Sequence, residues 1–341
     1  MGVTNNLTNI TIDSENQVYD SRDNCNAIIE TSTNILIKGA GATTIPNTVV
    51  SIANRAFSRC KALTTIDIPD SVTTIGSYAF NECSNLNHVN ISDHEITINS
   101  YAFYAAHIKS FNSNETGKCV IRNNMNIGFS AFFACDFTNI VIEDGFTTIS
   151  DSLFGNCKKL VKVTIPNSVT NLGDDTFSGC SALKSIGEVG SGSSVEIPDS
   201  ITTLNDGIFR ECTGITSVTI PDNITTIGGS VFSYCSSLTS ITIPNSVTTV
   251  GSAFSFCTSL SSVIIGNSVT SFVQEDGFRG CTALTTITSL AMTAPIIRNT
   301  TFTNIKENGT LYVPIGSTGY DVWMGTGNYY LGKYNWTKVE Q

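Results

Sequence analysis

Apolar and polar residues alternate in one short phrase that returns along the chain. "IPDSVTTIGSYAFNECSNL" begins at Ile68, "IPDNITTIGGSVFSYCSSL" at Ile220 and "IPNSVTTVGSAFSFCTSL" at Ile243. A phrase that recurs at a fixed period is the signature of a repeat architecture, in which each copy packs against its neighbours.

Phenylalanine and cysteine, three residues apart, mark the period, which is mostly 22 to 24 residues. Ten copies carry the phenylalanine: Phe57, Phe80, Phe103, Phe132, Phe154, Phe177, Phe209, Phe232, Phe254 and Phe278. Nine carry the cysteine, with Ala106 in the remaining copy: Cys60, Cys83, Cys135, Cys157, Cys180, Cys212, Cys235, Cys257 and Cys281. Two gaps are longer, which predicts surface insertions near residues 113–119 and 187–194.

Each copy predicts a short strand and a return. In residues 65–68, Ile66 and Ile68 would point inward and Thr65 and Asp67 outward, and Pro69 would end the strand. Val72 and Ile75 then bring the chain back to the core. Strands of successive copies would pair, because one copy alone cannot bury its apolar edge.

The second half of each copy predicts a bend and a turn. Glycine and asparagine dominate the column that begins with Gly76 and Asn99, which predicts a left-handed backbone there. Ala79, Phe80 and Cys83 would share one face of a helical turn. The predicted fold is a repeat solenoid, mainly β with short helical or 3-10 turns, of roughly eleven coils.

The consensus C-x-x-L-x-x-I/V-x-I-P-x-S-V-x-x-I-G-x-x-A-F resembles that of the BspA-like leucine-rich repeat family. Residues 18–46 look like the long repeat variant of this family, and "GTLYVPIGSTGYDVW" with "YNWTKVEQ" resembles its closing segment. The resemblance implies a leucine-rich repeat solenoid, which we expect over residues 1–290. The chain departs from the repeat from about Ala291, so residues 291–341 are expected to form a cap. It also implies a protein of the cell surface or extracellular space that mediates adhesion or recognition of a host or partner protein, without chemistry of its own.

The two ends depart from the repeat. "LTNITID" at residues 7–13 predicts a repeat strand, so the array would begin in the middle of a coil. We therefore expect missing repeats or a partner chain to cover that end. The first residues match no signal peptide pattern. At the other end, Trp323 and Trp336 predict a cap that closes the last coil, the alternative being an aromatic patch for a carbohydrate or protein.

Composition restricts the classes of molecule that can be partners. The 341 residues carry a net charge of −10, and only 13% are charged. This acidic balance argues against nucleic acid and anionic membranes as partners. No apolar run is long enough to span a bilayer.

The eleven cysteines do not suggest a disulfide framework. Stacked copies lie about 4.8 Å apart, farther than the Cβ spacing of a disulfide, so nine thiols are predicted to form a buried free ladder. Cys25 and Cys119 fall outside it and could be surface thiols or bonded. No paired Cys/His spacing predicts a metal site, and no cofactor motif is present.

Catalytic motifs are missing as well. The three histidines, His88, His94 and His107, are separated, and His88 and His94 are expected at the solvated surface. The sequence therefore predicts no enzyme.

The outward strand positions are the candidate binding face. Several of these positions carry charged, amide or imidazole groups. Together with two neighbouring threonines, they are Thr65, Asp67, His88, Asn90, Asn139, Lys162, Thr164 and Glu196. An exposed sheet tolerates Thr and Ser without any function, so this face has a purely structural interpretation as well.

Three functions remain open. The first is a surface-exposed module that binds a protein or glycan ligand through the strand face. The second is a structural component of a larger assembly, such as a virion decoration or appendage protein. The third is an intracellular scaffold, with which so many free thiols are compatible.

Overall fold

The computed structural model describes residues 7–187 and 194–341, so most of the predicted second insertion lies outside the described residues. The chain is a β-solenoid of about 12 turns with almost no helix, which confirms the predicted fold. It divides into two compact units. Unit 1 runs to Asp144 and includes Ser150–Leu160, and unit 2 comprises Gly145–Ile149 and Val161–Gln341.

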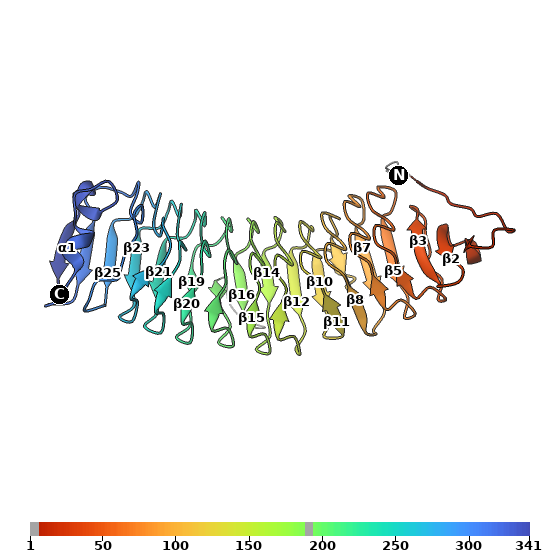
Figure 1. Ribbon diagram of the computed structural model, residues 1–341, viewed down its shortest axis with the longest axis horizontal. Coiled ribbons are helices and arrows are strands. Elements are labelled where there is room, and N and C mark those ends of the chain that lie inside the picture. The colour runs from red at the N-terminus through yellow and green to blue at the C-terminus, as the bar shows by residue number, and fades with distance from the viewer. Residues whose placement is uncertain (1–6, 188–193) are drawn as a thin grey trace. The chain divides into compact units, whose positions relative to one another are not determined.

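Unit 1 carries two rows of strands, which lie side by side from coil to coil (Figure 1). The front row is formed by β5 (Thr65–Ile68), β7 (His88–Ile91), β9 (Ser110–Phe111), β10 (Lys118–Ile121) and β12 (Asn139–Ile142). The back row is formed by β1 (Tyr19–Asp20), β2 (Ala27–Glu30), β3 (Ile35–Gly39), β4 (Ser51–Ile52), β6 (Thr74–Ile75), β8 (Ile96–Ile98) and β11 (Met125–Ile127). The front-row pairs are parallel, with Thr65 opposite His88 and Ile66 opposite Val89. In β5, Ile66 and Ile68 are buried and Thr65 and Asp67 exposed, as predicted.

Unit 2 repeats this plan. Its front-row strands are β14 (Lys162–Thr164), β16 (Ser185–Gly187), β17 (Val195–Glu196), β19 (Val218–Thr219), β21 (Ser240–Ile243), β23 (Ser262–Ile265), β25 (Thr286–Ser289), β26 (Thr310–Val313) and β27 (Thr337–Glu340). Its back-row strands are β13 (Thr148–Ile149), β15 (Asn171–Leu172), β18 (Thr203–Leu204), β20 (Thr226–Ile227), β22 (Thr249–Val250) and β24 (Ser271–Phe272).

Stacked phenylalanine rings fill the interior of each coil. The rings of Phe57 and Phe80 lie 4.8 Å apart, and those of Phe80 and Phe103 lie 5.0 Å apart, with interplanar angles below 10°. In unit 2 the ladder reaches Phe302, whose ring stacks on that of Phe278 at 6.0 Å. The geometry of the repeat therefore continues past residue 290.

The turn that holds each phenylalanine is built differently from the expected bend. Left-handed residues stand two positions before and two positions after the phenylalanine, as at Tyr78 (φ 58°) and Glu82 (φ 54°) around Phe80. Gly76 has no positive φ. A Cβ on Gly76 would lie only 2.5 Å from the Asn54 backbone nitrogen, so glycine is required there for close approach between coils.

Because left-handed residues flank each phenylalanine, the backbone N–H groups at alternate positions of the turn point toward the following coil. Arg55, Phe57 and Arg59 donate to the carbonyls of Ser77, Ala79 and Asn81 at 2.7 to 3.1 Å. The next turns of unit 1 repeat the arrangement, and those of unit 2 follow the same direction. Backbone hydrogen bonds therefore join the turns of successive coils, in addition to those between the strands.

All eleven cysteines are free and buried, including Cys25 and Cys119, which are therefore not surface thiols. Seven thiols of the ladder donate a hydrogen bond to the carbonyl of the phenylalanine one coil earlier. Their donor to acceptor distances range from 3.0 Å for Cys83 and Phe57 to 3.6 Å for Cys135 and Phe103. Each thiol is a small core filler that also satisfies a buried carbonyl.

The first described residues do not form the predicted strand. Residues 7–13 contain no strand, and β1, β2 and β3 instead form an antiparallel meander. The Asn26 side chain accepts from Ile10 N at 2.5 Å and donates to Thr8 O at 2.7 Å. The segment is thus held by the Asn26 side chain and by a backbone hydrogen bond from Gly41 N to Leu7 O, rather than by a strand ladder.

The C-terminal segment covers the last turn of unit 2. It contains α1 (Tyr320–Trp323) and a 3-10 helix, η2 (Leu331–Tyr334); η1 (Arg22–Asn24) belongs to unit 1. Trp323 and Trp336 are 1% and 5% exposed, and their indole N–H groups donate to Pro295 O and Lys306 O. The Tyr334 hydroxyl accepts from Asn304 N, at the place where a further coil would accept. This burial supports the cap interpretation of the two tryptophans.

Candidate functional site

One coil of unit 1 has an additional front strand. Strand β9 pairs with β7, and β10 pairs with both β9 and β12, whereas on the back row β11 pairs directly with β8. The extra residues of the first long copy were expected to form a surface insertion. Residues 112–117 do form a loop with exposed residues, but the residues after it form a strand, and Cys119 is buried because it takes an inward position on that strand.

Two side chains complete the hydrogen bonds that the short β9 leaves open. The Asn112 side chain accepts from Ile91 N at 2.9 Å and donates to Val120 O at 3.3 Å. The Arg122 guanidinium donates to Ile91 O at 2.8 Å. Both polar groups of the last residue of β7 therefore have partners although β9 ends at Phe111.

Replacing Asn112 by alanine is expected to lower the free energy of unfolding by about 1–3 kcal/mol, because Ile91 N and Val120 O lose their partner. Asn112 also has a φ of 51°, which alanine adopts less readily. Urea unfolding measures the loss, and hydrogen exchange of the Ile91 amide localises it.

The control is Asn123→Ala, which removes an exposed amide that donates to Asp144 O. We expect it to change stability by less than about 0.5 kcal/mol. Equal losses in the two variants would show that Asn112 has no special role in the ladder.

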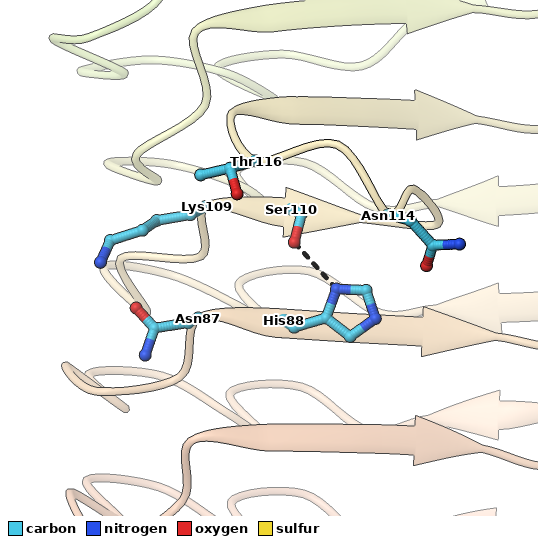
Figure 2. Close-up of a pocket in the computed structure, with 6 residues that line it drawn as sticks. All are labelled: Asn87, His88, Lys109, Ser110, Asn114 and Thr116. Atoms are coloured by element: carbon cyan, nitrogen blue, oxygen red, sulfur yellow. Dashed lines mark hydrogen bonds between the residues drawn. The ribbon is translucent and has the colours of Figure 1, made fainter.

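A polar depression of about 530 Å³ lies on the front row beside this loop. Figure 2 shows its lining, in which His88 and Ser110 come from neighbouring strands and Asn114 and Thr116 from the loop. Asn87 and Lys109 lie at the starts of β7 and β9 and complete it. Of the predicted face, His88 is the residue that the structure brings into this depression.

Hydrogen bonds fix the lining residues. His88 Nδ1 and Ser110 Oγ lie 2.8 Å apart, and Ser110 is 8% exposed, so the buried serine hydroxyl on the neighbouring strand fixes the ring. Asn87 Nδ2 donates to Asn85 O at 2.8 Å, which leaves Asn87 Oδ1 available as an acceptor. The loop is tied at its end, because Gly117 N donates to Lys109 O at 2.8 Å.

The charged groups near the depression differ in whether they are paired. Glu115 pairs with Lys118 at 2.7 Å, and Asp136 pairs with Lys159 at 2.7 Å and lies 3.6 Å from His107 Nδ1. Lys109 is exposed, and no carboxylate in the described part of the chain pairs with it. The lining itself contains no carboxylate, so its ammonium group is available to a ligand.

The other predicted face residues occupy different positions. Thr65, Asp67 and Asn90 are exposed on the front row of unit 1, and Asn139 is half-buried with no partner for its Oδ1. In unit 2, Glu196 is exposed and Lys162 half-buried, whereas Thr164 is only 9% exposed and offers little surface to a ligand.

A partly exposed aromatic cluster in unit 1 was not singled out from the sequence. Tyr78 and Tyr101 stack at 4.7 Å, Phe129 meets Tyr101 edge to face, and Arg55 lies 5.3 Å above the Tyr78 ring. The sequence does not show that these side chains are adjacent, because the repeat positions on either side of the buried phenylalanines had not been recognised as facing outward.

His94 differs from its expected place in solvent. It is half-buried, and its ring nitrogens lie 3.0 Å from Ser92 O and 2.7 Å from Val72 O. The ring therefore links two coils.

Two further features bear on the chemistry. Across residues 7–187 and 194–341, no three His, Cys, Asp or Glu side chains converge as metal ligands would. The described helices include none with the length and hydropathy needed to cross a bilayer.

Comparison with solved structures supports the fold. A leucine-rich repeat protein from Bacteroides ovatus is 24% identical, with 86% of this chain and 88% of that chain covered and a TM-score of 0.54. The pneumococcal vaccine antigen PcpA is 18% identical over 86% and 70% of the two chains, with a TM-score of 0.55. A leucine-rich repeat protein from Eubacterium ventriosum is 16% identical over 92% and 97%, with a TM-score of 0.51.

The sequence comparisons identify the family. A search among curated proteins finds no match. The family model described as a BspA type leucine rich repeat region matches residues 39–125, 117–191 and 188–308. The chain therefore belongs to the BspA-type leucine-rich repeat family.

Proposed function

We propose that this chain is a non-enzymatic binding protein of a cell surface or extracellular space, and that it recognises its partner through the front row of unit 1. The observation that carries this proposal is the depression around His88, where an extra strand and its loop build a concave polar lining on an otherwise regular sheet. Function on a repeat scaffold resides in such departures from the repeat.

The geometry around His88 supports binding rather than catalysis. His88 contacts a serine hydroxyl, but that hydroxyl is buried and no described carboxylate orients the other ring nitrogen. The backbone N–H groups of Lys109 and Ser110 both donate to Asn87 O, so they cannot stabilise an oxyanion. The pair lacks the remaining parts of a nucleophilic site.

The double substitution His88→Ala and Lys109→Ala is expected to weaken partner binding by about tenfold or more and to lower the free energy of unfolding by no more than about 1–3 kcal/mol, because the buried Ser110 hydroxyl loses its imidazole partner. Binding of the full chain to immobilised matrix proteins and to a glycan array measures the first effect. Calorimetry measures the second.

The matched control is Thr97→Ala, in a back-row depression that also measures about 530 Å³. It should retain wild-type binding. Equal affinity of the double variant and the wild type, or binding by neither to any ligand in the two panels, would contradict the proposal.

Antibody labelling of intact source cells and of the particles they release tests the location. Label on the cell envelope would support a surface-exposed binding protein. Label confined to particles would instead support the alternative of a structural component in an assembly.

A further inference from the structure

We infer that the depression around His88 accepts a sugar that carries a single negative charge, with the acidic group at Lys109 and the hydroxyls at the amide and hydroxyl side chains. This inference rests on the proposed function and names the ligand class of the same site.

The charge distribution favours an anion. The chain as a whole carries a net charge of −10, yet the six lining residues include one ammonium group and no carboxylate. Glu115, the acidic residue closest to Lys109 in sequence, is engaged by Lys118, and Asp136 is engaged by Lys159. Lys109 is thus a local positive charge on an acidic molecule, and one such charge matches one negative charge on the ligand.

The lining favours a ligand rich in hydroxyl groups. Every side chain in it is polar, so it offers no apolar pocket for the hydrophobic anchor residue that protein partners commonly insert. The available groups include the Asn87 oxygen, the Asn114 amide, the Thr116 hydroxyl and the second ring nitrogen of His88. Such a mixture of donors and acceptors suits sugar hydroxyls, which both donate and accept.

The arrangement gives the ligand a direction. In Figure 2, Lys109 and Asn87 lie at one end of the depression, and His88 and Asn114 lie toward the other. A volume of about 530 Å³ is within the range of small-ligand sites. This volume is compatible with a disaccharide or trisaccharide, whose terminal acidic residue would lie at Lys109.

Titration of the full chain with 3′-sialyllactose, 3′-sulfolactose and lactose, followed by NMR, tests the inference. At least one acidic sugar is expected to bind about tenfold more tightly than lactose. The two acidic sugars distinguish a carboxylate from a sulfate ester. Lys109→Gln should abolish the preference for the acidic sugar, and Lys109→Arg should retain it.

Lys158→Gln is the control, because Lys158 is exposed in the same unit but lies outside the lining. It should bind as the wild type does. Equal binding of lactose, binding of no sugar, or a preference that survives Lys109→Gln would overturn the inference. Equally tight binding of a tri-aspartate peptide would also overturn it and assign the site to an acidic protein segment.

The inference and the proposed function can fail separately. If His88→Ala weakens binding to a ligand from the panels while Lys109→Gln does not, the site is real and its ligand is not acidic. If neither variant changes binding, the proposed site fails as well.

Discussion

Raising the pH above about 9 is expected to destabilise the protein steeply. Burial raises the pKa of Cys83, Cys157 and Cys257 from the ordinary value of 9.0 to about 12, and it raises the pKa of Cys212, Cys235 and Cys281 well above 9.0. Between pH 9 and pH 12 the unfolded chain releases these protons and the folded chain retains them, so stability falls as pH rises. Each thiol contributes a loss of about 1.4 kcal/mol per pH unit in this window.

Urea unfolding at a series of pH values, in the presence of a reductant, measures this slope. The Cys157→Ala variant should be less stable at pH 7 and should lose stability with a slope that is smaller by the share of one thiol, about 1.4 kcal/mol per pH unit. A slope that is the same in the variant and the wild type would show that the thiols do not cause the alkaline unfolding.

Truncating Phe103 to alanine is expected to cost about 3–5 kcal/mol. Its ring is fully buried and contacts the rings of Phe80, Phe111 and Phe132, so its removal leaves a cavity among three aromatic neighbours. Because each coil contacts only its neighbours, the loss should be largest in the adjacent coils. Urea unfolding gives its size, and hydrogen exchange of the turn amides shows its location.

Phe129→Ala is the matched control for this cavity. The Phe129 side chain is 46% exposed and contacts Tyr101 at the surface of the same region, so its removal should cost less than about 1 kcal/mol. If the two substitutions cost the same, burial of the phenylalanine ladder would not be a main source of stability.

Local periodicity was enough to predict the solenoid. The alternation around Ile66 and the spacing from Phe80 to Cys83 state directly which side chains face the core. The left-handed residues were not predicted, because Tyr78 and Glu82 are not residue types that favour this conformation. Hydrogen bonds between coils impose it, and no single copy contains them.

The candidate site was predicted only in part. The outward position of His88 follows from strand alternation, but its contact with Ser110 depends on the register between coils. The long interval between Ala106 and Cys135 was the available signal for Lys109 and the loop. That interval is equally consistent with a simple surface loop. The sequence does not show that β9 ends early, and Asn112 and Arg122 bond to Ile91 because it does.

The hydrogen bonds of the turns run in one direction, whereas those of the return run in the other, as when Gly76 N donates to Ile52 O of the preceding coil. Arg55, Phe57 and Arg59 donate to the following coil, and at the last turn Asn304 donates to the Tyr334 hydroxyl instead. Within each unit, a turn therefore presents its carbonyl groups to the coil before it and its N–H groups to the coil after it. Within either unit, an additional coil would therefore have to join the turn ladder head to tail, with its turn N–H groups facing the carbonyls of the coil that follows it.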